Sequence, residues 1–184
     1  AYRELDTPTI PKKGEASLPL LHRLLAVYSA VYRVEAGAYY HHLRPWLNNI
    51  THPDLAGGVA EREPVEVAWD AQSDLEHSLL NKLDTAMASY DYKKFFDSFD
   101  PTFTRNMLMH VGFPPLLAQA WHNLHTHTVR TIKFGNTYGE PFAATSGIGQ
   151  GDPLSLIPAI ILVSWQFNMV DKRFPVIKLS LIHI

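Results

Sequence analysis

Residues 146–155 read Ser-Gly-Ile-Gly-Gln-Gly-Asp-Pro-Leu-Ser and lead into the most apolar run of the chain, residues 154–165. The alternating glycines let the backbone approach a ligand closely, because glycine carries no Cβ. Pro153 and Ser155 are typical of the first turn of a helix. The apolar run is shorter than the roughly 20 residues that span a membrane. The stretch therefore predicts a glycine-rich turn followed by a buried core helix, with no membrane-spanning segment.

Two known patterns compete for this stretch. A dinucleotide-binding fingerprint, G-x-G-x-x-G, needs a glycine where Asp152 stands and a strand–helix–strand unit around it, whereas the flanking sequence predicts a hairpin. The pattern Q-G-x-P-L-S fits all of its five fixed positions, and such a match arises by chance in about 1 of 10⁴ chains of this length. We therefore favour the second pattern.

Composition limits the possible classes of protein. The 184 residues, 46% of them hydrophobic, describe one globular domain. Lysine and arginine number 16 and aspartate and glutamate 18, a net charge of −2, so any site for a polyanion is a local patch. The absence of cysteine excludes disulfides, thiolate metal sites and a cysteine nucleophile.

The remaining elements mix helices with short strands. We expect a polar lead-in over 1–17, helices over 18–46, 70–84, 101–110 and 114–127, a strand over 86–92, and a hairpin of 128–134 with 141–145. Pro45 is expected near the end of the first helix, and residues 24–27 fit either that helix or a short strand. This order predicts the α+β fold class.

A second stretch, residues 89–97, reads Ser-Tyr-Asp-Tyr-Lys-Lys-Phe-Phe-Asp. A carboxylate at the end of a strand, here Asp91, is well placed to bind a divalent cation such as Mg²⁺, which prefers oxygen ligands. The alternative is a charged strand end that faces solvent, and the stretch alone does not separate the two.

Taken together, the two stretches resemble the reverse transcriptase family, in particular the enzymes of non-LTR retrotransposons and group II intron-like elements. Residues 91–97 resemble its first palm motif, with Lys94 and Phe96 in register, and residues 149–155 resemble its second. Residues 10–14 and Arg23 resemble the basic finger motifs. The resemblance implies the partial fingers and palm of a right-hand polymerase, with residues 1–90 leading into the palm and residues 91–171 forming part of it. Residues 172–184 fit no element and are treated as a non-native tail.

The resemblance also implies a function and a role for each matching residue. The function is RNA-directed DNA synthesis on an RNA template, from a DNA or RNA primer and deoxynucleoside triphosphates, with a pair of Mg²⁺ ions. The roles are metal binding (Asp91 and the Tyr92 carbonyl), exclusion of the 2′-hydroxyl (Phe96), a turn beside the templating base pair (Gln150 and Gly151), and triphosphate binding (Lys12, Lys13 and Arg23). Members of this family act in the nucleus or cytoplasm, and the sequence does not distinguish these locations.

The family's third palm motif, an aromatic-x-Asp-Asp hairpin, is absent after Ser155, where Asp171 is the one acidic residue. One carboxylate does not hold two metal ions, so we expect this chain by itself to be inactive.

Three alternative interpretations are compatible with the sequence. The chain could be a non-catalytic retroelement remnant that binds nucleic acid, or a metal-dependent hydrolase on a similar core. The histidines at 122, 125 and 127 could form a zinc site, but no acidic residue lies near them in the sequence, and core or solvated histidines are the simpler interpretation.

Overall fold

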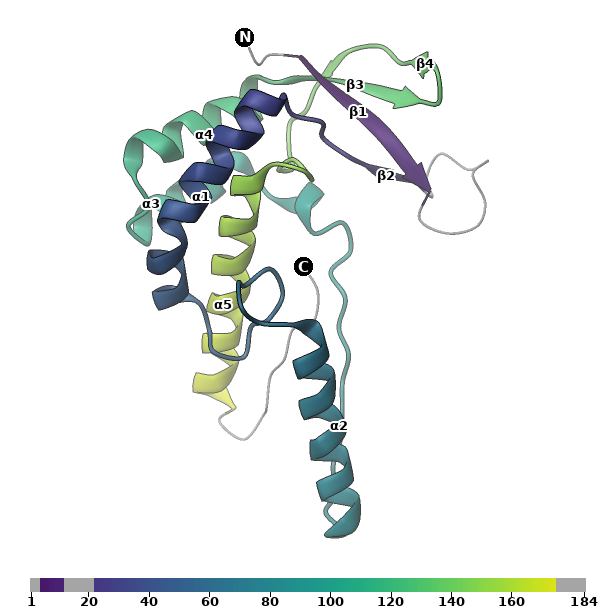
Figure 1. Cartoon of the computed structure of the whole chain (residues 1–184), viewed down its shortest axis with the longest axis vertical. Helices are drawn as coiled ribbons and strands as arrows, with labels where there is room; N and C mark the ends of the chain where they lie inside the picture. The colour runs from purple at the N-terminus through teal and green to yellow at the C-terminus, as the bar shows by residue number, and fades with distance from the viewer. Residues whose placement is uncertain (1–3, 12–21, 175–184) are drawn as a thin grey trace. The chain divides into compact units, whose positions relative to one another are not determined.

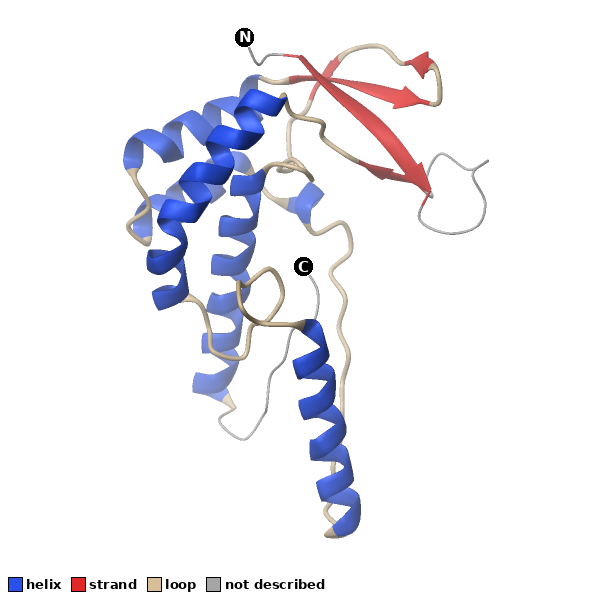
Figure 2. Ribbon diagram, in the orientation of Figure 1, coloured by secondary structure: helices blue, strands red, loops and turns tan. Residues whose placement is uncertain are grey.

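The strands of the protein form one curled sheet (Figure 2). The computed structural model describes residues 4–11 and 22–174. The strands are β1 (Glu4–Pro11), β2 (His22–Leu24), β3 (Val129–Phe134), β4 (Thr137–Tyr138) and β5 (Phe142–Ala143). Their order is β2-β1-β3-β4, and β5 also pairs with β3. The central pair, β1 and β3, is parallel, whereas the other pairs are antiparallel.

Helices make up most of the remaining regular structure (Figure 1). They are α1 (Ala30–Ile50), α2 (Pro64–Leu80), α3 (Pro101–His110), α4 (Pro115–His127) and α5 (Leu156–Arg173), with short 3₁₀ turns η2 (Phe96–Ser98) and η3 (Pro153–Ser155). The chain is thus a mixture of helices and strands. Its relation to polymerase fingers and palm stays a prediction.

The chain divides into two compact units. The first comprises Ala1–Leu43 and Lys94–Pro158, and the second comprises Arg44–Lys93 and Ala159–Ile184. Every described strand belongs to the first unit. These units differ from the segments 1–90 and 91–171 that the resemblance implies, and those segments stay predictions.

In the first unit, short-range signals in the sequence set the helix ends. Asp100 caps α3, because its Oδ1 accepts a hydrogen bond of 2.6 Å from the backbone N–H of Phe103. Pro101 then fills the first helical position, where no N–H is needed. Between α3 and α4, Gly112 adopts a φ of 87°, and Phe113 is buried after it. Leu5 of β1 packs with Ala26 and Tyr28, which joins the sheet to the segment before α1.

In the second unit, a loop over residues 51–63 is held by polar contacts. The Arg62 guanidinium donates to the carbonyls of His52, Pro53 and Leu55 at 2.6 to 3.0 Å. The buried His52 ring makes a 2.8 Å contact with Asp171 through Nε2. Helix α2 has no buried residue, and Trp69 on it is 73% exposed.

Three sequence-based expectations are wrong. Residues 86–92 form no strand, because no neighbouring strand pairs with them and all seven are exposed. The expected polar lead-in contains β1, which is stabilised by pairing with the distant β3. Residues 22–29 are not helical, since His22–Leu24 form β2 and α1 begins only at Ala30, whereas Pro45 lies near the end of α1 as expected.

The apolar helix at the carboxyl-terminal side behaves as expected for a core helix. Within the described residues, the stretch Pro153–Arg173 is long and apolar enough to cross a membrane by length and composition alone, yet 56% of its apolar 18-residue window is buried inside the protein. Ile157, Ile160 and Val163 are at most 1% exposed.

Candidate functional site

A pocket of about 370 Å³ in the first unit brings together residues that are distant in the sequence. Phe96 of η2 forms one side of it, and the turn from Gly149 to Pro153 forms another. Leu25 and Leu156 add apolar surface. The pocket therefore contains the centre of both sequence motifs, the phenylalanine of the first and the Gln150–Gly151 pair of the second.

Backbone hydrogen bonds join the two motifs directly. The N–H of Ile148 donates to the carbonyl oxygen of Phe96 at 2.9 Å, and the N–H of Gly147 donates to that of Phe99 at 2.7 Å. On the other side of the turn, the N–H of Ala26 donates to the carbonyl oxygen of Gln150 at 2.8 Å. The turn is thus fixed between the η2 segment and the segment that leads to α1.

Two positions of this turn require glycine, because a side chain there would collide with other parts of the protein. A Cβ at Gly151 would lie 2.5 Å from the carbonyl oxygen of Ala26, and the φ of this residue is +121°, a region that other residues rarely adopt. A Cβ at Gly149 would lie 2.9 Å from ring atoms of Tyr28. The sequence interpretation attributed the glycines to close approach of a ligand, but at these two positions the close neighbours are Tyr28 and Ala26.

The turn ends at a buried carboxylate, Asp152, whose side chain has no exposed surface. Its two oxygens accept five hydrogen bonds. Oδ1 accepts from the hydroxyl of Tyr32 at 2.8 Å and from the backbone N–H of Leu154 at 3.0 Å. The three donors to Oδ2 are Trp121 Nε1 at 3.1 Å, His125 Nε2 at 3.1 Å and Ser155 Oγ at 2.8 Å. We call these six residues the Asp152 cluster.

The ionisation of the Asp152 cluster follows from these contacts. Burial by itself raises the pKa of Asp152, but the hydrogen bonds from His125, Tyr32 and Leu154 outweigh burial and leave that pKa below its ordinary value. Burial and the neighbouring Asp152 charge raise the pKa of the Tyr32 hydroxyl, which therefore acts as a donor. Nδ1 of His125 has no hydrogen-bond partner among the described residues, whereas its Nε2 faces the carboxylate.

The predicted site residues fall into four groups, the last of which is Asp91 with Tyr92. Phe96 and Gln150 are half-buried and line the pocket together with Gly151. Arg23 is an exposed residue of β2, paired with Ile10 of β1. Lys12 and Lys13 lie outside the described residues.

Asp91 and Tyr92 belong to the second unit, where both are exposed residues of an irregular segment. The Tyr92 hydroxyl donates a hydrogen bond to Oε1 of Gln166 in the same unit. The expected position of Asp91 at a strand end is wrong, because residues 86–92 are not a strand.

The residues present do not complete a metal site. Across residues 4–11 and 22–174, no group of three or more histidine, aspartate or glutamate side chains could hold a metal ion. Asp152 offers no ligand, because its lone pairs are occupied by five donors. His122 and His125 do not act together as the zinc alternative requires, since His125 contacts Asp152 and Nε2 of His122 contacts Thr102 at 3.2 Å.

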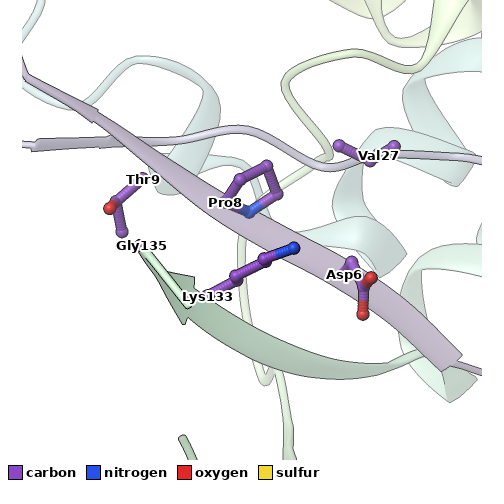
Figure 3. A pocket seen from close by; sticks show the side chains of 6 residues that line it. All are labelled: Asp6, Pro8, Thr9, Val27, Lys133 and Gly135. Carbon is purple, nitrogen blue, oxygen red and sulfur yellow. The ribbon is translucent and has the colours of Figure 1, made fainter. Parts of the chain in front are cut away.

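A second pocket of about 370 Å³ lies on the sheet and contains none of the predicted site residues. Figure 3 shows Lys133 of β3 extending across β1 between Pro8 and Asp6. Lys133 also lies over the ring of Tyr138, with its Nζ 5.1 Å from the ring centre. The one cation and one carboxylate of this pocket indicate no particular ligand, so the Phe96 pocket is the candidate site.

Sequence reasoning treated Asp152 as a variable position and missed its cluster. A local signal existed, because Asp-Pro-x-Ser is typical of a capped helix start. The contacts to Tyr32, Trp121 and His125 could not be predicted, since they depend on how distant helices pack.

No protein-family model matches the chain, but one curated protein, from a transposon, is similar to it. The chain is 26% identical over 146 residues to the "Transposon TX1 uncharacterized 149 kDa protein" of Xenopus laevis. The match covers 79% of this chain and 11% of that protein, so the chain spans a small part of the relative's length.

Proposed function

We propose that the chain is part of a reverse transcriptase of a non-LTR retrotransposon, and that the Phe96 pocket receives the sugar and base of the incoming deoxynucleotide. The observation that carries the proposal is that Phe96 lines one pocket with Gln150 and Gly151. These residues come from the two stretches that resemble palm motifs, and the fold joins them by backbone hydrogen bonds.

The chemistry of the pocket suits an uncharged part of a nucleotide. Phe96, Leu25, Pro153 and Leu156 supply apolar surface for a sugar or base, and Gln150 supplies an amide that can hydrogen-bond to a base edge. No lysine or arginine lines this pocket among the described residues, so phosphates would be bound by other residues. Arg23 and the lysines at 12 and 13 are our candidates for that task.

The name of the Xenopus laevis relative supports a retroelement origin of the chain. That name says nothing of the reaction we propose. Asp91 and the Tyr92 carbonyl are proposed as ligands for one metal ion, and the chemistry that a two-ion site supplies is in-line phosphoryl transfer. Further carboxylates would be needed, so the described residues alone account for nucleotide binding rather than for catalysis.

Binding of a fluorescent primed RNA template tests the proposal. The labelled DNA primer is annealed to an RNA strand, and anisotropy is followed as the chain is added. We expect saturable binding that Phe96→Ala weakens by about tenfold, the loss typical of removing an aromatic stacking or packing contact. The matched control is Phe103→Ala, because Phe103 is 57% exposed on α3 and does not line the pocket.

Equal binding by both variants would contradict the assignment of the pocket. Absence of binding by the unmodified chain would contradict the proposed nucleic-acid function as a whole. Equal affinity for a primed template and for an unpaired RNA would favour the non-catalytic remnant over the polymerase part.

A further inference from the structure

The Asp152 cluster adjoins the candidate pocket without offering it a ligand group. Asp152 lines the pocket beside Gln150 and Gly151, yet its carboxylate has no exposed surface. A carboxylate has about four lone-pair sites, and five donors already contact this one. Asp152 therefore acts on neighbouring protein groups and does not touch a ligand directly.

The donors to Asp152 come from three separate segments of the first unit. Tyr32 lies in α1, Trp121 and His125 lie one turn apart in α4, and Leu154 and Ser155 begin the helix after the turn. Ring contacts add to the hydrogen bonds, since the Trp121 and His125 rings lie 4.3 Å apart and the Tyr28 and Tyr32 rings 5.1 Å apart. The carboxylate thus ties one end of the turn to α1 and α4.

The position of the turn depends on these hydrogen bonds of Asp152, given the other contacts that the turn makes. Its other fixed points are backbone hydrogen bonds from Gly147 to Phe99, from Ile148 to Phe96 and from Ala26 to Gln150, and a 3.4 Å contact from the Arg130 guanidinium to the Gly147 carbonyl. Among the described residues, no side-chain hydrogen bond holds the Gln150 amide in place. A shift at Asp152 would therefore move the two residues that precede it.

We propose that Asp152 is a positioning residue, which fixes the Gln150–Gly151 turn against Phe96 through its buried hydrogen bonds to α1 and α4. The role of the turn in binding nucleic acid rests on the proposed function, but the positioning itself does not. The chemistry requires an acceptor-only group, because every one of the five partners donates. An amide in place of the carboxylate would bring an NH₂ against donors.

Hydrogen exchange of the full chain, followed by mass spectrometry, tests this inference without any ligand. The variant is Asp152→Asn, and the matched control is Asp100→Asn. Asp100 also precedes a proline and caps a helix, but it is exposed and accepts from Phe103. Asparagine caps helices about as well as aspartate, so the comparison isolates the buried contacts from the capping.

We expect Asp152→Asn to speed exchange of peptides within residues 147–156 by about tenfold or more, with α3 unchanged, whereas Asp100→Asn leaves residues 147–156 unaffected. Binding of the primed RNA template should weaken together with the faster exchange. If Asp152→Asn does not fold, Tyr32→Phe removes one donor and should give a smaller increase in the same peptides.

Unchanged hydrogen exchange over residues 147–156 in the folded variants would overturn the inference. An equal increase of exchange in α3 would also overturn it, because such an increase indicates loss of global stability alone. Local loosening without any template binding by the unmodified chain would contradict the proposed function while supporting the positioning role. Local loosening with unaltered template binding would overturn the link between the turn and the ligand.

Discussion

The backbone N–H of Ile148 donates to the carbonyl oxygen of Phe96 across 2.9 Å, so two stretches about fifty residues apart in the chain meet at one pocket. Phe96 lies in a short 3₁₀ turn, and Ile148 is 1% exposed. Because a buried backbone pair is costly to break, this bond fixes the distance between Phe96 and the Gln150–Gly151 turn. The predictions below test what that arrangement does.

Phe96 is expected to select the sugar of the incoming nucleotide. The test uses a longer polypeptide that includes this chain and an x-Asp-Asp hairpin. In it, Phe96→Ala should reduce discrimination against ribonucleotides by about tenfold or more, because loss of one pocket contact changes the ratio of catalytic efficiencies by about that factor. Primer extension with each kind of triphosphate measures the ratio, and Phe103→Ala is the control. Unchanged sugar selectivity would exclude this role for Phe96.

Asp91 is expected to act as a metal ligand in the same longer polypeptide. Asp91→Ala should lower primer extension by at least about a hundredfold, since even outer-shell partners of a metal contribute up to about that factor. Asp84→Ala is the matched control, because Asp84 is also an exposed residue of the segment before Lys93. Normal extension by the Asp91 variant would refute the assignment.

Gly151 should tolerate no side chain, whereas Gly37 should. Gly151→Ala places a Cβ 2.5 Å from the Ala26 carbonyl oxygen at a φ of +121°, and we expect it to lower the free energy of unfolding by about 2 kcal/mol or more. Gly37 lies within α1, where a Cβ would have no neighbour within 4 Å, so Gly37→Ala should raise stability by about 0.5–1 kcal/mol. Urea unfolding of both variants measures the difference. Equal stability of the two would contradict the packing described for the turn.

Protonation of Asp152 should weaken the fold in acid. Its pKa lies below the ordinary value of 3.8 in the folded protein, so its contribution to stability is present above about pH 4. That contribution is lost as the pH falls through the lowered folded-state pKa. Urea unfolding between pH 7 and about pH 3 should show a steeper acid loss for the unmodified chain than for Asp152→Asn. Parallel pH profiles would show that Asp152 is not ionised in its cluster.

Local sequence signals predicted part of this structure. The expected helix over 101–110 matches α3, and 114–127 matches α4 within one residue, because proline and glycine mark their ends. The strand expected over 128–134 matches β3 within one residue. The ends of α3 and α4 depend on residues close to them in the chain.

Features that depend on distant partners were not predicted. Strand β1 exists because it pairs in parallel with β3, and residues 86–92 lack such a partner and form no strand. For the site, the motifs identified Phe96, Gln150 and Gly151, which the pocket brings together. Asp152 was missed because its importance comes from Tyr32, Trp121 and His125, which no local pattern connects to it.

Cross-linking tests the central claim most directly, which is that the Phe96 pocket receives the incoming nucleotide opposite the first unpaired template base. A primed RNA template with 4-thiouridine at the first unpaired template position is irradiated in complex with the chain, and the modified peptides are mapped by mass spectrometry. The account predicts cross-links within residues 147–156 and at Phe96, which Phe96→Ala reduces and Phe103→Ala does not. A bound template whose cross-links all lie outside those residues would contradict it.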